Sequence, residues 1–300
     1  MPMNQQQHRL GLLICCMAPL AWSLSGLFTR AISTDLMALL FWRGLFSGTA
    51  VFIAFLILER GQAWNSLQKL RWPAIAVAVL SAAGMITGIG SMRYGSVADA
   101  MVIYATVPFI TAGLAYVTIG ERPSRSTLIA AVVAMAGVLI MLVGSGFGGG
   151  TLFGKMLAFA MTCCMASFSV LLRRNRDVPM LPAMAASAYL AAFFCFWFAD
   201  SLKVSTQDIV LIGLFGVVQN AAGLIFYTLG SRLVPAAEAT LIAALEVPLT
   251  PLWVWMFMAE VPKGPTLLGG AVVMVALFGH IYNELRGRTP AEPEGFEVGV

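Results

Sequence analysis

Hydrophobic runs of about 20 residues recur along almost the whole chain, and they limit what it can fold into. As an α-helix, such a run spans the hydrocarbon core of a bilayer, because each residue adds about 1.5 Å. Hydrophobic residues make up 59% of the chain and charged residues 11%, against roughly 25% charged in soluble domains. The sequence predicts an all-α integral membrane protein with about ten transmembrane helices. The predicted spans are 9–31, 36–58, 72–91, 96–118, 125–144, 152–172, 180–200, 207–230, 235–258 and 264–283.

The distribution of Lys and Arg predicts the orientation of these spans, because basic residues resist translocation. The two chain ends and alternate loops hold 12 of them, whereas the opposite loops hold 5. Both termini are therefore expected in the cytoplasm, and the net charge of +4 indicates membrane topology rather than nucleic-acid binding.

Two stretches of the chain, 92–100 and 231–239, read alike at an offset of 139 residues. Each leads into an apolar span with an internal proline and then an acidic residue two positions before another proline. These markers are Pro108, Glu121 and Pro123 in the first half and Pro248, Glu260 and Pro262 in the second. We infer a duplicated five-helix unit, and because five is odd the second unit enters the membrane from the opposite side.

The predicted organisation is thus two inverted five-helix repeats at residues 1–144 and 152–285. A glycine-rich linker at 145–151 joins them, and a polar tail at 286–300 is expected to be a disordered cytoplasmic segment.

Several motifs together resemble the EamA-type transporters of the drug/metabolite transporter superfamily. They are Trp22-Ser23, Arg43, the run from Gly95 to Pro108, Gly120-Glu121-Arg122, Glu246-Val247-Pro248 and Ala259-Glu260. The resemblance covers residues 9–283. It implies a ten-helix inner-membrane carrier, often an exporter of amino acids, other metabolites or toxic compounds, and one branch exports aromatic amino acids. The seventh span departs from the repeat, since it has no counterpart of Arg43.

Two charged residues stand out, because a central charge in a membrane costs roughly 2.5–3.5 kcal/mol on insertion scales. Arg43 lies a third of the way through its span. It either attracts a solute carboxylate or clamps backbone carbonyls of a neighbouring helix. Glu246 lies beside Pro248, where a kink would free polar groups; it either carries a proton or pairs with an interhelical donor. Pro108 and Pro248 are interpreted as hinges.

Other mid-span residues extend the predicted substrate site. Amide side chains can bind either end of a zwitterion or simply join helices, and an aromatic wall with adaptable Met would suit a flat, partly apolar solute. These candidates are Trp22, Met85, Thr87, Tyr104, Ser167, Gln219, Asn220 and Tyr227.

Two charge pairs with a spacing of six, Arg93 with Asp99 and Arg232 with Glu238, are candidate gates on opposite sides of the membrane. The alternative is that they are exposed ion pairs of little energetic value. His280, near the cytoplasmic end of the last span, is interpreted as an interfacial residue.

The sequence lacks the features that are typical of several other classes of protein. The sequence contains no GxxxxGK[ST] loop, so it gives no indication of ATP-driven transport. Its two histidines are too few for a metal cluster, and no cofactor is expected. A membrane-embedded enzyme would need clustered nucleophiles, and a channel would not need an internal duplication. The sequence therefore favours a secondary transporter that exports amino acids, aromatic ones first, or related metabolites. A drug, toxic-metabolite or nucleotide-sugar-type carrier is the alternative. The sequence is compatible with both a monomer and a dimer.

Overall fold

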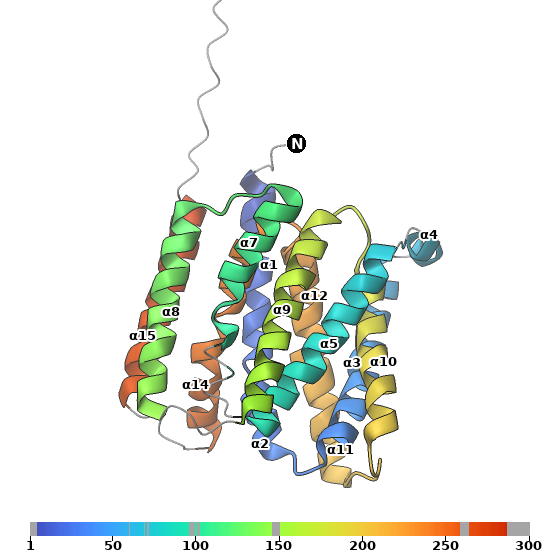
Figure 1. The fold of residues 1–300 in the computed structure, drawn as a ribbon. Coiled ribbons are helices and arrows are strands. Elements are labelled where there is room, and N and C mark those ends of the chain that lie inside the picture. Colours follow the sequence, from blue (N-terminus) through green and yellow to red (C-terminus); the bar gives the residue numbers. More distant parts are fainter. Residues whose placement is uncertain are drawn as a thin grey trace, which may run out of the picture.

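In the computed structural model, every regular element among the described residues is a helix (Figure 1). The structure describes residues 5–59, 61–68, 70, 72–95, 100, 103–145, 151–258 and 264–286. The helices are α1 (Gln5–Trp22), α2 (Ser25–Ala31), α3 (Leu36–Glu59), α4 (Ala63–Gln68), α5 (Trp72–Tyr94), α7 (Val107–Ile119), α8 (Arg125–Ser145), α9 (Leu152–Arg174), α10 (Leu181–Phe198), α11 (Thr206–Leu214), the π-helix η1 (Phe215–Ala221), α12 (Ala222–Gly230), α13 (Ala236–Ala243), α14 (Glu246–Met258) and α15 (Gly264–Arg286).

The length and hydropathy of these helices fit a multi-pass membrane protein. Seven segments are long and apolar enough to cross a bilayer, and three shorter apolar helices accompany them at Val107–Ile119, Arg125–Ile140 and Leu267–Asn283. The integral membrane class predicted from the sequence is confirmed, whereas length and composition do not confirm a count of ten spans. Most of the predicted linker, residues 146–150, and the tail from 287 onward lie outside the described residues.

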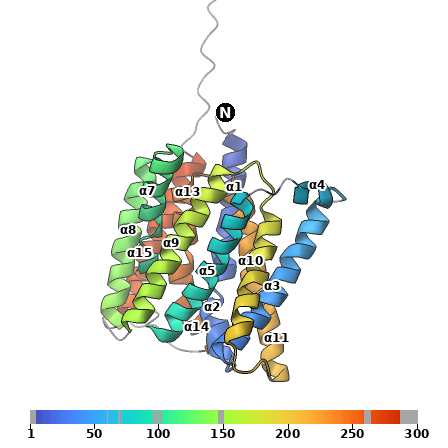
Figure 2. The same ribbon diagram turned by 45° about the vertical axis from the view of Figure 1, so that its right-hand side comes forward.

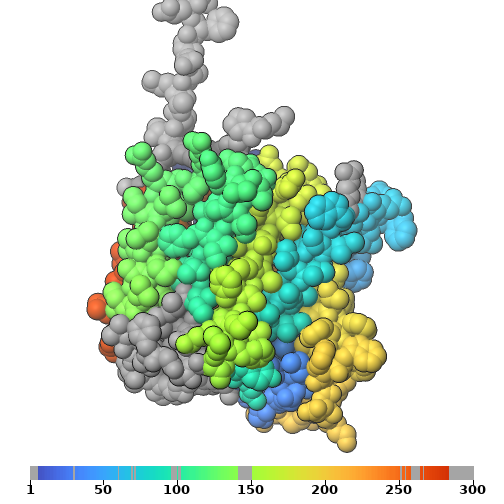
Figure 3. All heavy atoms as spheres, in the orientation of Figure 1, coloured from blue at the N-terminus to red at the C-terminus, as the bar shows by residue number. Residues whose placement is uncertain are grey.

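Helices of the two halves pair with each other across the bundle. α8 packs against α15, and α3 packs against α10. α5 packs against α9, and α1 packs against α12 (Figures 1 and 2). A Cβ atom at Gly44 of α3 would lie 2.7 Å from the Ala188 carbonyl oxygen, and one at Gly137 of α8 would lie 2.8 Å from that of Gly269. Glycine thus permits the close approach in both pairs. The space-filling view shows the same mixing, with α9 and α5 side by side between α7 and α10 (Figure 3).

The backbone breaks in the same way ahead of both internal prolines. The Thr106 amide donates to the Ile103 carbonyl and the Ile110 amide to the Thr106 carbonyl; the Leu245 amide donates to Ile242 and the Leu249 amide to Leu245. These bonds differ by the 139-residue offset of the sequence repeat. Each proline then lies in the first turn of a new helix, where its missing N–H leaves no bond unmade.

The segment Thr206–Gly230 contains a π-helical insertion between two α-helical parts. Such insertions are rare and often occur at functional sites. Here the insertion contains Gln219 and Asn220. Its Gly216 lies against α3, since a Cβ atom there would be 2.8 Å from the Arg43 carbonyl oxygen. The insertion therefore places two amide side chains beside α3.

Candidate functional site

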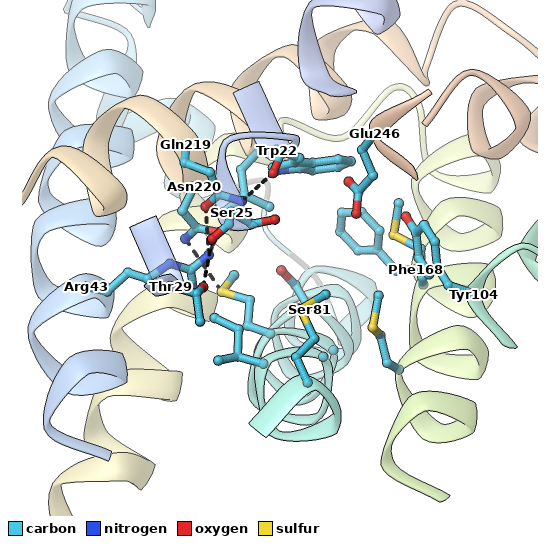
Figure 4. Close-up of a pocket in the computed structure, with 18 of the residues that line it drawn as sticks. Trp22, Ser25, Thr29, Arg43, Ser81, Tyr104, Phe168, Gln219, Asn220 and Glu246 are labelled. Atoms are coloured by element: carbon cyan, nitrogen blue, oxygen red, sulfur yellow. Dashed lines mark hydrogen bonds between the residues drawn. The ribbon is translucent and has the colours of Figure 1, made fainter. Parts of the chain in front are cut away.

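A cavity of about 140 Å³ lies at the centre of the bundle, between helices of both halves (Figure 4). Its wall reaches Thr29 of α2 and Met92 of α5, which lie toward the end of the bundle away from the N-terminus. The polar residues of the wall are Ser25, Thr29, Arg43, Ser81, Gln219, Asn220 and Glu246.

Arg43 is the centre of a buried hydrogen-bond network at one end of this cavity. Its Nη2 donates to Gln219 Oε1 at 2.9 Å and to Asn220 Oδ1 at 3.0 Å. Asn220 Nδ2 in turn donates to Ser47 Oγ at 2.7 Å, and the guanidinium carbon lies 4.5 Å from the centre of the Phe215 ring. These neutral partners fix the orientation of the guanidinium while leaving its charge in place.

No carboxylate of the described residues forms an ion pair with Arg43. The residue is 5% exposed, and its Nε has no hydrogen-bond partner. A buried cation with a free donor is costly unless something pairs with it. The arrangement therefore suits an anionic group of a bound solute.

Glu246 lies at the other end of the cavity, with Trp22 between it and the amides of η1 (Figure 4). It is the first residue of α14 and is 9% exposed. Among the described residues, none donates a hydrogen bond to its carboxylate oxygens. The cavity thus holds one buried guanidinium and one buried carboxyl group, and neither forms an ion pair within the described part of the chain.

The wall between these charges is formed mainly by sulfur-containing and aromatic side chains. On α5 and α9 they recur at helical spacing, so each helix presents one face to the cavity. Trp22 lies against Gly223, where any side chain would overlap its indole ring. The apolar side chains that share this wall are Trp22, Leu80, Met85, Ile89, Met92, Tyr104, Met161, Met165, Phe168 and Leu224.

The cavity brings together most of the substrate-site residues predicted from the sequence, namely Trp22, Arg43, Met85, Tyr104, Gln219, Asn220 and Glu246. Three others lie outside its wall. Thr87 donates to the Ala83 carbonyl of its own helix at 2.7 Å, and Ser167 precedes the wall residue Phe168 by about 100° of helix rotation. Tyr227 is fully buried behind the wall, where its hydroxyl bonds Ser169 Oγ at 2.6 Å.

Of the two candidate gates, only the pair of Arg232 with Glu238 lies within the described residues, and there each residue has a different partner. Arg93 is exposed, and Asp99 lies outside the described residues. The Arg232 guanidinium donates to the Arg176 carbonyl oxygen, whereas the Glu238 carboxylate lies 3.0 Å from His8 Nε2. Burial lowers the pKa of Arg232.

His280, interpreted from the sequence as an interfacial residue, is buried within the protein near one end of the bundle. His280 is 3% exposed, and its Nε2 lies 3.6 Å from Glu238 Oε1. The sequence does not reveal that the start of α13 packs against this end of α15.

The sequence analysis missed several wall residues that helical spacing could have predicted. On α5 the missed residues Ser81, Gly88 and Met92 lie on one face with the predicted Met85, at intervals of three or four residues. The same spacing relates Met161, Met165 and Phe168 on α9. Ser25 and Thr29 follow the wall residue Trp22 at the same intervals of three and four residues, across the break at residues 23–24.

Fold and cavity together define a multi-pass helical membrane protein with a polar central site between two repeated halves, the architecture of a solute transporter. Residues 9–143 and 152–282 each match the EamA-like transporter family. The chain belongs to this family, which is a family of transporters.

Similar proteins agree with this assignment. The pseudopaline exporter CntI of Pseudomonas aeruginosa, from strains UCBPP-PA14 and PAO1, is 23% identical over 275 residues, which covers 89% of this chain and 94% of that protein. A solved crystal structure shares the fold, with a TM-score of 0.77 at 21% identity over 93% of this chain and 99% of its own.

Proposed function

We propose that this transporter exports a small zwitterionic, amino-acid-like solute by alternating access of its central cavity. The observation that carries the proposal is that one cavity contains two buried ionisable residues, Arg43 and Glu246, neither of which has an ion-pair partner among the described residues. Arg43 binds the carboxylate of the solute and Glu246 its ammonium group. Because each charge is costly when buried alone, a zwitterion that spans them lowers the free energy of both.

The wall of the cavity supports a solute that carries an apolar or aromatic side chain. Trp22, Tyr104 and Phe168 offer ring faces, and the four methionines offer adaptable contacts. We therefore retain aromatic amino acids as the first probes, with related amino-acid derivatives next. The name of the similar CntI proteins, pseudopaline exporter, supports export as the direction.

The proposed carrier lies in a bacterial inner membrane, with ten spans and both termini in the cytoplasm. The bias of basic residues toward the two ends and alternate loops supports this orientation. Fluorescent-protein fusions at the C-terminus are expected to fluoresce, and alkaline phosphatase fusions at the same site are expected to be inactive. Active phosphatase there would reverse the orientation.

Solute counterflow in proteoliposomes tests the binding scheme. Vesicles are preloaded with phenylalanine, and uptake of labelled phenylalanine is challenged with phenylalaninamide, which lacks the carboxylate, and with 3-phenylpropionate, which lacks the amine. The wild type is expected to exchange phenylalanine and to bind both analogues weakly. Arg43→Met is expected to lose its preference for phenylalanine over the amide, and Glu246→Gln its preference over the propionate.

Thr87→Val is the matched control, because Thr87 lies on a wall helix but outside the wall and bonds only to its own helix. It is expected to exchange phenylalanine like the wild type. If the folded wild type exchanges none of a full panel of amino acids, the zwitterion proposal is wrong. A drug or another metabolite is then the better candidate.

A further inference from the structure

Both histidines of the chain converge on one buried carboxylate, far from each other in sequence. His8 Nε2 lies 3.0 Å from Glu238 Oε2, and His280 Nε2 lies 3.6 Å from Glu238 Oε1. All three residues are at most 3% exposed. Ser126 Oγ lies 3.0 Å from His280 Nδ1 and holds the far side of that ring. We call His8, Glu238 and His280 the His–Glu–His cluster.

The cluster joins helices of both halves at the end of the bundle nearest the N-terminus. His8 is near the start of α1, Glu238 is in the first turn of α13, and His280 is in the later part of α15. The wall of the central cavity extends toward the opposite end. Because the cavity wall extends the other way, we take the side of the cluster as the closed side of the carrier.

Backbone packing near the cluster supports this assignment of the closed side. A Cβ atom at Gly11 of α1 would lie 2.5 Å from Leu233 Cβ, and one at Gly230 would lie 2.7 Å from the Cys15 amide nitrogen. α1 thus packs tightly against the end of α12 and the turn before α13. Opening on this side requires these segments to separate, and the cluster links them.

The electrostatic surroundings make the cluster depend on a proton. Cys15 and Cys16 of α1 are the other titratable groups that interact with Glu238. From α9 and the end of α7, Arg173 and Glu121 pair with each other at 3.3 Å on this side, and α8 contributes the uncharged Ser126. With one proton shared by the two imidazoles the cluster is neutral. Without that proton it is a buried, uncompensated anion, which is strongly unfavourable.

One contact of the cluster is incomplete in this state. Glu238 Oε1 and His280 Nε2 are both buried without a hydrogen-bond partner, although they face each other at 3.6 Å. Buried polar atoms are nearly always bonded. This pair is therefore poised to form a bond when the imidazole carries a proton there.

We propose that the His–Glu–His cluster is a proton-binding site whose occupancy holds the N-terminal side of the carrier closed. Loss of the proton leaves the carboxylate without a compensating positive charge, and water relieves this only when α1 moves away from α13 and α15. The pH on that side thus controls how often the central cavity opens to it. Only this last step rests on the proposed transport function.

Spin-label distances in the solute-free protein test the site without any transport assay. Labels are placed at Gln7 and Asn283, which are exposed on α1 and α15 near the cluster, in the full chain with its five native cysteines replaced by alanine. The distance between the labels is expected to lengthen as the pH is raised and the shared proton leaves the cluster.

Two non-titrating variants decide the outcome. Glu238→Gln and His8→Gln are each expected to abolish the pH-dependent shift, and His8→Gln remains informative if the first variant does not fold. Glu121→Gln, which removes the other charge pair on this side, is the control and is expected to keep the shift. A wild-type distance that does not change with pH, or a shift that survives both variants, would overturn the proposal. Neither result depends on whether phenylalanine is transported.

Discussion

Replacing Asn220 by aspartate is expected to switch off the attraction of Arg43 for a carboxylate. Asn220 Oδ1 accepts a hydrogen bond from Arg43 Nη2 at 3.0 Å, so aspartate places a carboxylate oxygen at the same point with almost no change in shape. The other aspartate oxygen can accept from Ser47, whose hydroxyl now donates instead of accepting. The variant should therefore fold.

The size of the effect is set by the charge pair that aspartate creates. Unit charges about 4 Å apart attract by about 4 kcal/mol at an effective dielectric constant of about 20, so Arg43 becomes compensated from within the protein. The solute carboxylate then loses a charge-assisted hydrogen bond worth about 1.5–3 kcal/mol. At about 1.4 kcal/mol per tenfold change, the affinity for phenylalanine should fall by roughly 10- to 150-fold.

Competition in counterflow measures this change with an internal reference. Phenylalaninamide has the same ring and amine but no carboxylate, so its affinity should change little in Asn220→Asp. The ratio of the two affinities is the quantity of interest. If both ligands weaken equally, the substitution has altered the shape of the cavity, and the assignment of Arg43 as the carboxylate site is refuted.

Three substitutions elsewhere test the packing around the site. Gly223→Val should displace the Trp22 indole, which leaves no room for a side chain there, and should lower the rate of counterflow while the protein still purifies as a folded monodisperse species. Tyr227→Phe removes the buried bond to Ser169 and should lower stability by about 0.5–1.5 kcal/mol, visible as a lower thermal unfolding midpoint with unchanged competition by phenylalaninamide. Gly137→Leu should separate α8 from α15 and reduce the yield of folded protein in a size-exclusion assay.

The outline of the fold is predictable from hydropathy and internal duplication, because both depend on patterns local to the chain. Mid-span charges and amides also indicate residues of the central cavity, since polar groups in a membrane face a partner or a cavity. The positions of Pro108 and Pro248 predict breaks in two spans. The structure adds that each break precedes its proline, so that Glu246 begins a helix at the cavity.

The errors of side-chain orientation have a common physical origin in helix phase. A regular α-helix would place Tyr227 on the face of Asn220 two turns away, but Asn220 itself lies in the π-helix Phe215–Ala221, whose wider turn changes the direction of its side chain relative to the α-helix that follows. Thr87 is two residues, or about 200° of rotation, from Met85 and so points away from the cavity. A π-helix has no simple sequence signature, so this phase change could not be predicted.

The duplication that builds the fold does not extend to the chemistry of the site. α10, the counterpart of α3, contains no charged residue, and α7, the counterpart of α14, begins with Val107 where α14 begins with Glu246. The positive and negative ends of the cavity are therefore each supplied once, by different halves. A zwitterion bound between them has one orientation, and when the halves rock it keeps that orientation while access changes from one side of the membrane to the other.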